Sequence, residues 1–458
     1  MNRHADGDPV QHDSRYDTAG SIATNVADGF TMVAVGDLIV SRPLTRGHDQ
    51  GIGAIVEIIR DADVGFGNME TNIFDIRSFK GSPQAEYGGA YHVSVPELGP
   101  DLKAMGFNLL SCANNHTFDW GLEGMRETCR ALDQNGIVHA GVGDTLAQAG
   151  APRFLETQRG RVALVSFATT FTPMSRACDP AGAAPGRPGL NGLRLSRSVL
   201  VPAQMLQSLT RICNALPNSA PAADDKHVVI AGVRFKAAEQ AGYSYKVNAR
   251  DVTAIVRNVR QGKQFADFCI ATNHGHEPGN WSQEPPDYEQ SFARRLIDAG
   301  ADAYIGHGPH QLRGIEIYKG RPILYSLGNF IMDDLRTPVG ADMFEAYGNN
   351  PQLDTDAEVT LNEMSTGYQT DPGFSDPVFY QSIITVSQFE QNQLKELRLY
   401  PIELGHSKRF ANRGVPCLAP ASQGRVILER LQKLSQPFAT QIEINNNVGI
   451  IRLQSGSQ

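Results

Sequence analysis

The sequence predicts an α/β fold in a single large domain with loop insertions, and three observations support this class. Short apolar runs rich in Val, Ile, Phe and Ala recur along the chain. Each run ends abruptly in polar residues, and helical patterns lie between the runs. Near-continuous apolar runs that alternate with helices are typical of buried, largely parallel strands.

The order of the expected elements follows from these runs. The central strands are expected at residues 30–37, 62–70, 107–116, 162–170, 267–277, 302–310 and 322–330. Helices are expected near 51–60, 97–105, 121–135, 249–261 and 287–299. A β-hairpin near 379–387 and 394–402, a helix near 422–435 and a last strand near 447–453 complete the prediction.

Three segments lack this pattern and set the expected boundaries. Residues 1–28 are polar and are expected to form a disordered or loosely docked tail. Residues 171–228 are rich in Pro, Gly and Ala, which predicts a long surface excursion with one helix near 202–215, and residues 335–375 look loop-like and acidic. We therefore expect a domain at 29–405 with an insertion at 171–250, and a C-terminal extension at 406–458 packed on it.

Composition bounds the functional classes. The chain has 458 residues, of which 41% are hydrophobic and 20% charged, so a sizeable core is expected. The net charge of −8 argues against a nucleic-acid partner, which normally needs a basic face. An anionic substrate stays open, because a bound metal reverses the local sign of charge. The oligomeric state is not predicted.

The cysteines and the N-terminal residues indicate in which cellular compartment the protein is expected. No two of the six cysteines form a C-x-x-C pair, and Cys112 and Cys269 lie in apolar runs, which favours buried thiols in a reducing compartment. The first 28 residues carry no apolar region of a signal peptide, and no apolar stretch is long enough to span a bilayer. These features predict a cytoplasmic protein without a membrane span.

Polar residues with metal-binding groups follow one expected strand after another. Ligands of open α/β sheets bind outside the carboxyl ends of the strands, and five of the chain's twelve histidines fall there. A lone histidine at such a place is more often structural, but a set of five with two carboxylates favours a metal site. The candidate residues are Asp37, Glu70, Asn115, His116, His274, His276, His307 and His310.

The chemistry of this set restricts the metal. Imidazole, carboxylate and carboxamide groups without a thiolate favour Mn²⁺, Zn²⁺ or Fe²⁺ over a structural thiolate site, and over Ca²⁺ or Mg²⁺ alone. The set is larger than one ion requires. Either two ions share a bridging carboxylate, or some of the residues act as acid, base or support for the ligands.

Other polar residues are candidates for substrate binding. Arg42 follows Asp37 by five residues, and we expect it either to contact an anionic substrate or to form a surface salt bridge. Tyr91 and His92 follow a Gly-rich loop and are candidates for the edge of the cleft. Asn329 ends the last central strand. Asp119 is explained equally well by helix capping.

At these residues the sequence resembles the CapA family of poly-γ-glutamate capsule-biosynthesis proteins, which is related to the calcineurin-like metallophosphoesterases. The resemblance covers roughly residues 30–335. It rests on VGDLIVSR (35–42), GNME (67–70), CANNHTFDWGLEGM (112–125), HAGVGDTLAQA (139–149) and ADAYIGHGPHQLRGIEIYKGRPILYSLGNF (301–330).

The resemblance implies a four-layer α/β/β/α sandwich of the metallophosphoesterase type, with one or two divalent ions at the sheet edge. It places Asp37 and His310 on the first ion and Glu70 between the ions. It places Asn115, His274 and His307 on the second ion, with His116 as the general acid. The chain departs from the pattern at two places. Ile39 stands where the metallophosphoesterase Asp-x-His motif has its histidine, and Asn273-His274-Gly275-His276-Glu277 replaces a common His-Trp-Gly motif, which leaves His276 as a second catalytic candidate.

The resemblance implies a metal-dependent hydrolase acting on a phosphoester or on an amide or peptide-like bond, with γ-glutamyl bonds included. The substrate is thus a small or peptide-like molecule. Three alternatives remain: a component of poly-γ-glutamate or capsule synthesis, a metal-dependent peptide epimerase, and a non-catalytic binding module. Fold alone does not decide among them.

Overall fold

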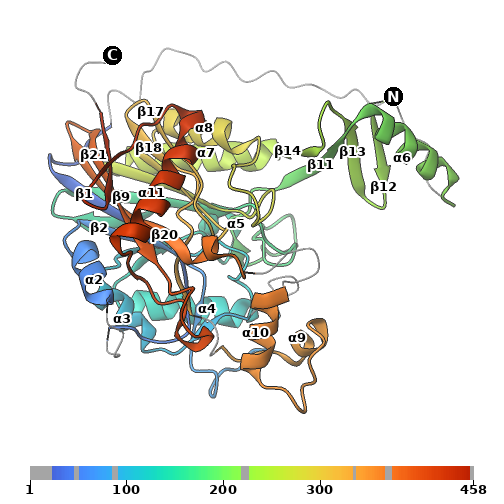
Figure 1. Ribbon diagram of the computed structural model, residues 1–458, viewed down its shortest axis with the longest axis horizontal. Helices are drawn as coiled ribbons and strands as arrows, with labels where there is room; N and C mark the ends of the chain where they lie inside the picture. Colours follow the sequence, from blue (N-terminus) through green and yellow to red (C-terminus); the bar gives the residue numbers. More distant parts are fainter. Residues whose placement is uncertain are drawn as a thin grey trace.

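The computed structural model describes residues 23–45, 51–84, 91–217, 226–333, 337–366 and 374–453, and these form a mixed α/β domain with several sheets (Figure 1). Of the predicted tail at residues 1–28, residues 1–22 lie outside the described part. Within the described part of the tail, residues 23–28, Val26 is buried in the main core. All six cysteines are free thiols, as predicted, and Cys112 and Cys269 are buried.

Two large sheets organise the described residues. The strands of the first are β1 (Phe30–Val40), β2 (Val64–Met69), β5 (Leu109–Ser111), β6 (Val138–Ala140), β19 (Asn329–Asp333), β20 (Gln381–Glu390), β21 (Gln393–Glu403), β22 (Cys417–Leu418), β23 (Glu443–Asn445) and β24 (Val448–Arg452). The strands of the second are β8 (Arg153–Thr157), β9 (Gly160–Ala168), β15 (Phe268–His274), β16 (Ala303–His307), β17 (Ile315–Tyr318) and β18 (Arg321–Leu324).

The strands that matter for the site run parallel. In the first sheet β1 pairs in parallel with both β2 and β19, and β2 with β5. In the second sheet β15 pairs in parallel with β9 and with β16. Antiparallel strands such as β20 and β8 flank these groups. The prediction of largely parallel central strands is therefore confirmed.

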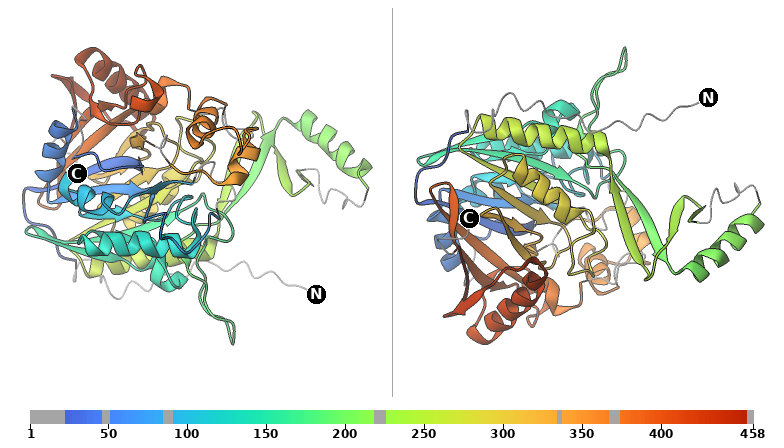
Figure 2. Two further views of the ribbon diagram at one scale, coloured as in Figure 1. Left: turned by 90° about the horizontal axis from the view of Figure 1, so that it is seen from below. Right: turned by 90° about the horizontal axis from the view of Figure 1, so that it is seen from above.

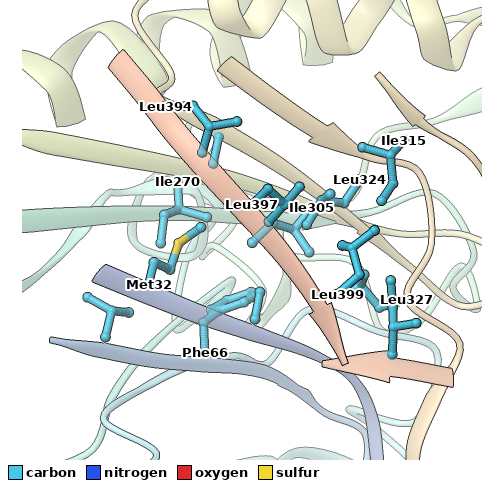
Figure 3. Close-up of a cluster of buried hydrophobic side chains, with 14 of the residues drawn as sticks. Met32, Phe66, Ile270, Ile305, Ile315, Leu324, Leu327, Leu394, Leu397 and Leu399 are labelled. Carbon is cyan, nitrogen blue, oxygen red and sulfur yellow. The ribbon is translucent and has the colours of Figure 1, made fainter. Parts of the chain in front are cut away.

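The two sheets face each other across one core. Successive side chains of a strand point to opposite faces, so Met32 and Ala34 enter the core between the sheets while Val33 and Val35 enter a second core. Figure 3 shows Met32 and Phe66 of the first sheet near Ile270 and Ile305 of the second. This pattern explains why the apolar runs are nearly continuous.

Helices cover the outer faces of the sheets (Figure 1). On the first sheet, α2 (Ile52–Arg60), α3 (Leu98–Met105) and α4 (Gly121–Gln134) contribute apolar side chains to the second core. On the second sheet, α7 (Ala249–Gln264) and α8 (Glu289–Asp298) pack over β9 and β15. Helix α11 (Ala421–Ser435) packs into the core between the sheets. All six helices lie near their predicted positions.

Residues 406–453 are integrated into the first sheet. Strand β24 pairs with β21 in antiparallel fashion through Leu397 and Leu399, which lie opposite Ile451 and Gly449. Strand β22 pairs with the other end of β21. The predicted last strand at 447–453 and the hairpin are thus present as β24, β20 and β21.

Two segments contain more regular structure than the sequence predicts. The excursion does carry the expected helix, α6 (Ala203–Ala215), but the wider insertion at 171–250 also holds a sheet of four strands. These are β11 (Leu195–Val201), β12 (His227–Ile230), β13 (Val233–Ala237) and β14 (Gly242–Val247). The segment predicted as a loop at 335–375 holds α9 (Ala341–Ala346) and α10 (Asp356–Thr366). Both expectations were wrong because small, half-exposed elements bury too few apolar residues to show a clear period.

Candidate metal centre

The candidate residues meet where the carboxyl ends of the two sheets come together. Asp37 lies in β1, in register with Asn68 of β2 on one side and Asn329 of β19 on the other. In the second sheet, His274 of β15 is in register with His307 of β16. Parallel pairing thus delivers polar side chains from both sheets to one place, as expected for strand ends.

Asp37 is fully buried and stands at the centre of this group. Its Oδ1 accepts a hydrogen bond of 2.9 Å from Nδ2 of Asn68 and lies 3.4 Å from Nδ1 of His307. Its Oδ2 lies 3.8 Å from Nδ1 of His310. Burial opposes ionisation, but the contact with His307 and the fields of His274 and His310 outweigh it, so the pKa of Asp37 is lowered.

Glu70 follows β2 and is also 0% exposed, yet neither of its carboxylate oxygens has a hydrogen-bond partner. Its Oε1 lies 3.4 Å from Nε2 of His274 and 3.9 Å from Nε2 of His116. Burial, reinforced by the charges of Asp37 and Asp119, raises the pKa of Glu70 well above its usual range. A buried carboxylate without a partner is costly, and a cation is what such a group lacks.

His307 presents a second set of buried atoms without partners. Its side chain is 2% exposed, and neither ring nitrogen has a hydrogen-bond partner. Native proteins rarely leave buried polar atoms in this state, and a bound ion satisfies such atoms in many proteins. Buried nitrogen and oxygen atoms of this kind are the donors that a transition metal takes.

Two overlapping groups of donors are close enough to hold an ion. Asp37, Glu70 and His274 form one, and Glu70, His276 and His310 form the other, with the donor atoms of each group within 4.8 Å of one another. Glu70 belongs to both groups. Asp37 groups with His274, and it also lies 3.8 Å from His310, with which the family pattern pairs it.

His276, a member of the second group, is held in place by its neighbours. Its Nε2 lies 3.0 Å from Nε2 of His274 and 3.3 Å from Oδ1 of Asn115, and its Nδ1 shares a hydrogen bond of 2.7 Å with Oδ1 of Asn280. Burial and the nearby His310 lower the pKa of His276 to about 3, so its ring is neutral at pH 7. A neutral imidazole is the form that binds a metal.

His116 approaches the same centre from the loop after β5. Its Nδ1 shares a hydrogen bond of 2.7 Å with Oδ2 of Asp119, while its Nε2 faces Glu70. The backbone N–H of His92 donates to the same Asp119 oxygen at 3.1 Å, and the ring of His92 lies 4.1 Å from that of His116. Burial lowers the pKa of His92 well below its usual range and raises that of Asp119.

His310 and Asn329 are fixed by backbone geometry as well as by contacts. His310 has a φ of 57°, a left-handed conformation that residues other than glycine seldom adopt. Its Nδ1 shares a hydrogen bond of 2.8 Å with Oδ1 of Asn329, whose amide donates to backbone oxygens of His310 and Phe379. Such conformations persist where the surroundings hold them, often at functional sites.

Two candidates for substrate binding have other contacts. Nε of Arg42 lies 3.1 Å from Oδ2 of Asp333, which matches the salt-bridge alternative. Tyr91 is buried in an aromatic cluster with Phe74 and Trp120, and its hydroxyl donates to Asp342 in the first turn of α9. Neither residue belongs to the two donor groups.

Some residues that the fold brings to the centre were undervalued in the prediction from sequence. Asp119 was explained by capping, although its spacing of three residues from His116 was visible. Asn68 and Asn114 precede the candidates Glu70 and Asn115 and were given no role, but they link Asp37 to Met69 through hydrogen bonds. Asn280 gave no signal, because only the loop geometry brings it to His276.

Comparisons with known proteins show which proteins this chain is similar to. Two proteins of Sinorhizobium fredii, "Uncharacterized protein y4sH" and "Uncharacterized protein y4uA", are each 66% identical over 449 residues, which is 97% of this chain and of each relative. "PGA biosynthesis protein CapA" of Bacillus subtilis is 25% identical over 65% of this chain and 62% of its own length.

"Probable polyglutamine synthesis accessory protein MT0602" of Mycobacterium tuberculosis is 29% identical over 55% of this chain and 52% of its own length. Among the described residues, no helix has the length and apolar character needed to cross a membrane. A family described as "Bacterial capsule synthesis protein PGA_cap" matches residues 31–334, more than half of the chain, and the match includes every candidate donor named above. This chain therefore belongs to the bacterial capsule synthesis protein family.

Proposed function

We propose that this protein is a metal-dependent hydrolase whose site lies between the carboxyl ends of its two large sheets. The observation that carries the proposal is Glu70, which is fully buried, has no hydrogen-bond partner and belongs to both donor groups. We also propose that the two facing sheets with their outer helices correspond to the four-layer α/β/β/α sandwich of the metallophosphoesterase type. The insertion and the C-terminal extension would then be additions to one domain.

The donor groups determine how ions would be held. Asp37, Glu70 and His274 would hold one ion, and Glu70, His276 and His310 a second, with Glu70 as the bridging carboxylate. His307 and Asn115 lie beside these groups and complete the donor set. Mn²⁺, Zn²⁺ and Fe²⁺ match these nitrogen and oxygen donors. Such an ion supplies a Lewis acid that activates water at neutral pH and polarises the substrate oxygen.

The residues around the centre supply proton transfer. Asp119 holds Nδ1 of His116, so Nε2 of His116 is left to exchange a proton with the substrate. A general acid so placed protonates the leaving group, either an alkoxide or an amine. His276 is the second candidate for this work because it is only partly buried, and in that role it would not act as a donor of the second group.

The donor groups do not by themselves distinguish a phosphoester from an amide as the bond that is cleaved. A phosphoester and an amide bond both pass through states in which oxygen gains negative charge, and the same centre stabilises both. The relative from Bacillus subtilis is named for PGA biosynthesis and the one from Mycobacterium tuberculosis for polyglutamine synthesis, and a polymer of amino acids favours an amide bond. The second candidate function, an accessory role in polyglutamate or capsule synthesis, rests on those names.

Metal analysis and two assays test the proposal. The full chain is stripped with a chelator, loaded separately with Mn²⁺, Zn²⁺ or Fe²⁺, and assayed on an aryl phosphate and on a γ-glutamyl anilide. We expect metal-dependent turnover of one of them, and its loss together with bound metal in Glu70→Gln. Glu123→Gln, an exposed carboxylate on α4, is the control and keeps both.

Three results would overturn the hydrolase. Absence of bound metal after loading removes the centre itself. Full metal content without turnover of either substrate favours the accessory role. Deuterium uptake at a peptide α-carbon without cleavage assigns the chain to epimerisation instead.

A further inference from the structure

A small sheet projects from the body of the protein and carries an excess of positive charge. It consists of β12, β13, β11 and β14 in this order, and α6 packs on one of its faces (Figure 2). Its described residues, 195–217 and 226–247, contain six Lys or Arg residues and a single acidic residue, Glu239. The whole chain, by contrast, has a net charge of −8. We call residues 195–217 and 226–247 the arm.

The register of the arm shows which side chains share a face. Arg197 of β11 lies opposite Tyr245 of β14, and Val199 lies opposite Tyr243. Directly paired residues and alternate residues of a strand point to the same side, so Arg197, Tyr243 and Tyr245 share one face. Lys246 is paired with Ser196 and points to the opposite face.

The face with Arg197 is continuous with the body through aromatic contacts. The guanidinium of Arg197 lies over the ring of Tyr243, 5.6 Å from its centre, and the ring of Tyr243 lies 6.4 Å from that of Trp281. Tyr245 contacts Tyr288 of the body at 6.1 Å. Arg197 is exposed, and Tyr243 and Trp281 are 40% and 57% exposed, so these three side chains present a surface to solvent.

Trp281 connects this surface to the candidate metal centre. It follows Asn280, whose side chain holds Nδ1 of His276. The loop that contains Trp281 is held by buried Arg313, which donates to the backbone oxygens of Glu277 and Ser282 at 2.7 and 3.2 Å. The indole packs directly over Gly279, where a Cβ would overlap it. Trp281 is therefore positioned on a fixed loop, next to the residue that holds His276.

We propose that Arg197, Tyr243 and Trp281 form an outer subsite that binds the chain of an acidic peptide whose reacting bond lies at the metal centre. This inference rests on the proposed function and adds the residues that determine specificity. An exposed indole and phenol supply contact area for the chain, and the guanidinium pairs with a carboxylate. Aromatic residues and arginine carry most of the binding energy in known interfaces.

The charge of the arm favours an acidic chain over a neutral one. Arg197 has no carboxylate partner among the described residues, and its guanidinium lies over the Tyr243 ring instead. The nearby carboxylate of Asp287 is already bound by the backbone N–H of Tyr245 at 3.0 Å. A cation left without a counter-charge attracts an anionic ligand, and the basic strands around it raise the local ligand concentration.

Calorimetry tests the subsite without turnover. Hexaglutamate, in α-linked and in γ-linked form, is titrated into the full-length protein in chelator and again after metal loading. We expect saturable binding of at least one form in both conditions and weak or no binding of hexaglutamine. Because the protein has only two tryptophans and Trp120 is buried, quenching of Trp281 fluorescence gives a second readout.

Matched variants locate the binding surface. Trp281→Ala and Arg197→Ala are expected to raise the dissociation constant about tenfold each, and Trp281→Phe and Arg197→Lys to recover part of it. The controls are Lys246→Ala on the opposite face of the same arm and Phe265→Ala, whose side chain is also 57% exposed. Both are expected to stay within about twofold of the parent.

The outcomes separate this inference from the hydrolase. Binding without turnover leaves the subsite standing and removes the proposed activity. Turnover of the γ-glutamyl anilide without binding of either hexaglutamate overturns the subsite alone. Equal losses of hexaglutamate affinity in Arg197→Ala and Lys246→Ala would mean that only overall charge matters, which overturns the subsite. Equally tight binding of hexaglutamine overturns it too.

Discussion

Oε1 of Glu70 lies 3.4 Å from Nε2 of His274, and the two residues come from different sheets. Glu70 follows β2 in the first sheet, and His274 ends β15 in the second. This contact therefore exists only when the two sheets pack together through their shared core. Folding and assembly of the donor groups are the same event here, which links metal content to stability.

Replacing Glu70 with Gln is expected to have opposite effects with and without metal. The change removes the donor common to both groups, so bound metal should fall close to zero. In chelator, the free energy of unfolding should rise by about 1–3 kcal/mol, because a buried carboxylate without a partner is replaced by a neutral amide. Denaturant unfolding and metal analysis measure both effects. A fall in stability in chelator would show that the carboxylate has a partner in solution.

Changes at His116 and Asp119 are expected to lower turnover while metal is retained. His116→Ala removes the proton donor and should lower kcat by about 10² to 10⁴-fold. Asp119→Asn should lower it less, because the amide still accepts from His92 but no longer favours one tautomer of the ring. The measurement is kcat on the cleaved substrate at full metal content.

The chain offers a matched control for this pair. His139 and Asp133 form another His–Asp contact, 3.2 Å long, with Asp133 exposed. Asp133→Asn is expected to leave kcat unchanged. If His116→Ala instead loses metal in parallel with turnover, His116 is a ligand and not an acid.

The donor positions could be predicted from the sequence because they depend on strand ends. His274 ends β15, and Asp37 interrupts the apolar run of β1 at a register shift near its carboxyl end, so parallel pairing puts both at one edge whatever the loops do. Helices α2, α7 and α8 were predicted for a similar reason, since each buries a regular apolar stripe.

The grouping of the donors could not be predicted from the sequence. Asp37 lies 3.8 Å from ring nitrogens of both His274 and His310, and these distances depend on how the two sheets pack, about which periodicity carries no information. Asn280 reaches His276 through a loop conformation held by Gln311 and Arg313. The arm was missed because its strands are short and half-exposed, so Ser, Arg and Lys interrupt the apolar alternation.

Glu289 is expected to make stability depend on pH. It is buried, it accepts a hydrogen bond of 2.8 Å from Tyr304, and burial raises its pKa from 4.5 to about 7. Below pH 4.5 the carboxyl is protonated in both the folded and the unfolded state, so it does not lower the free energy of unfolding. Between pH 4.5 and about 7 the unfolded chain releases this proton first, so stability falls as pH rises and stays reduced above pH 7.

Glu289→Gln should remove this dependence. Its amide oxygen still accepts from Tyr304, so the variant should match the parent near pH 4 and exceed it at pH 8 by up to about 3 kcal/mol. Denaturant unfolding of both proteins across this range, in chelator, measures the difference. A gap that does not grow with pH would mean that Arg313, 3.8 Å away, keeps the carboxylate ionised in the folded state.

Two glycines in the same region of the chain should respond to alanine in opposite directions. At Gly36 in β1 an added Cβ would overlap the backbone carbonyl of Gly328, which accepts a hydrogen bond of 3.0 Å from Asp37. Gly36→Ala must therefore push β19 away from β1 and displace Asp37 and Asn329. We expect a loss of about 1–3 kcal/mol in the free energy of unfolding, together with weaker metal binding.

Gly53, in the first turn of α2, has no atom within 4 Å of an added Cβ and is exposed. Gly53→Ala should raise the free energy of unfolding by about 0.5–1 kcal/mol, because alanine loses less conformational entropy in a helix. Its metal content should not change. Denaturant unfolding and metal analysis of the pair separate backbone crowding at the centre from a general effect of removing glycine. If Gly36→Ala retains full stability and metal, β1 and β19 do not approach each other closely beside Asp37, and the site must be assembled in another way.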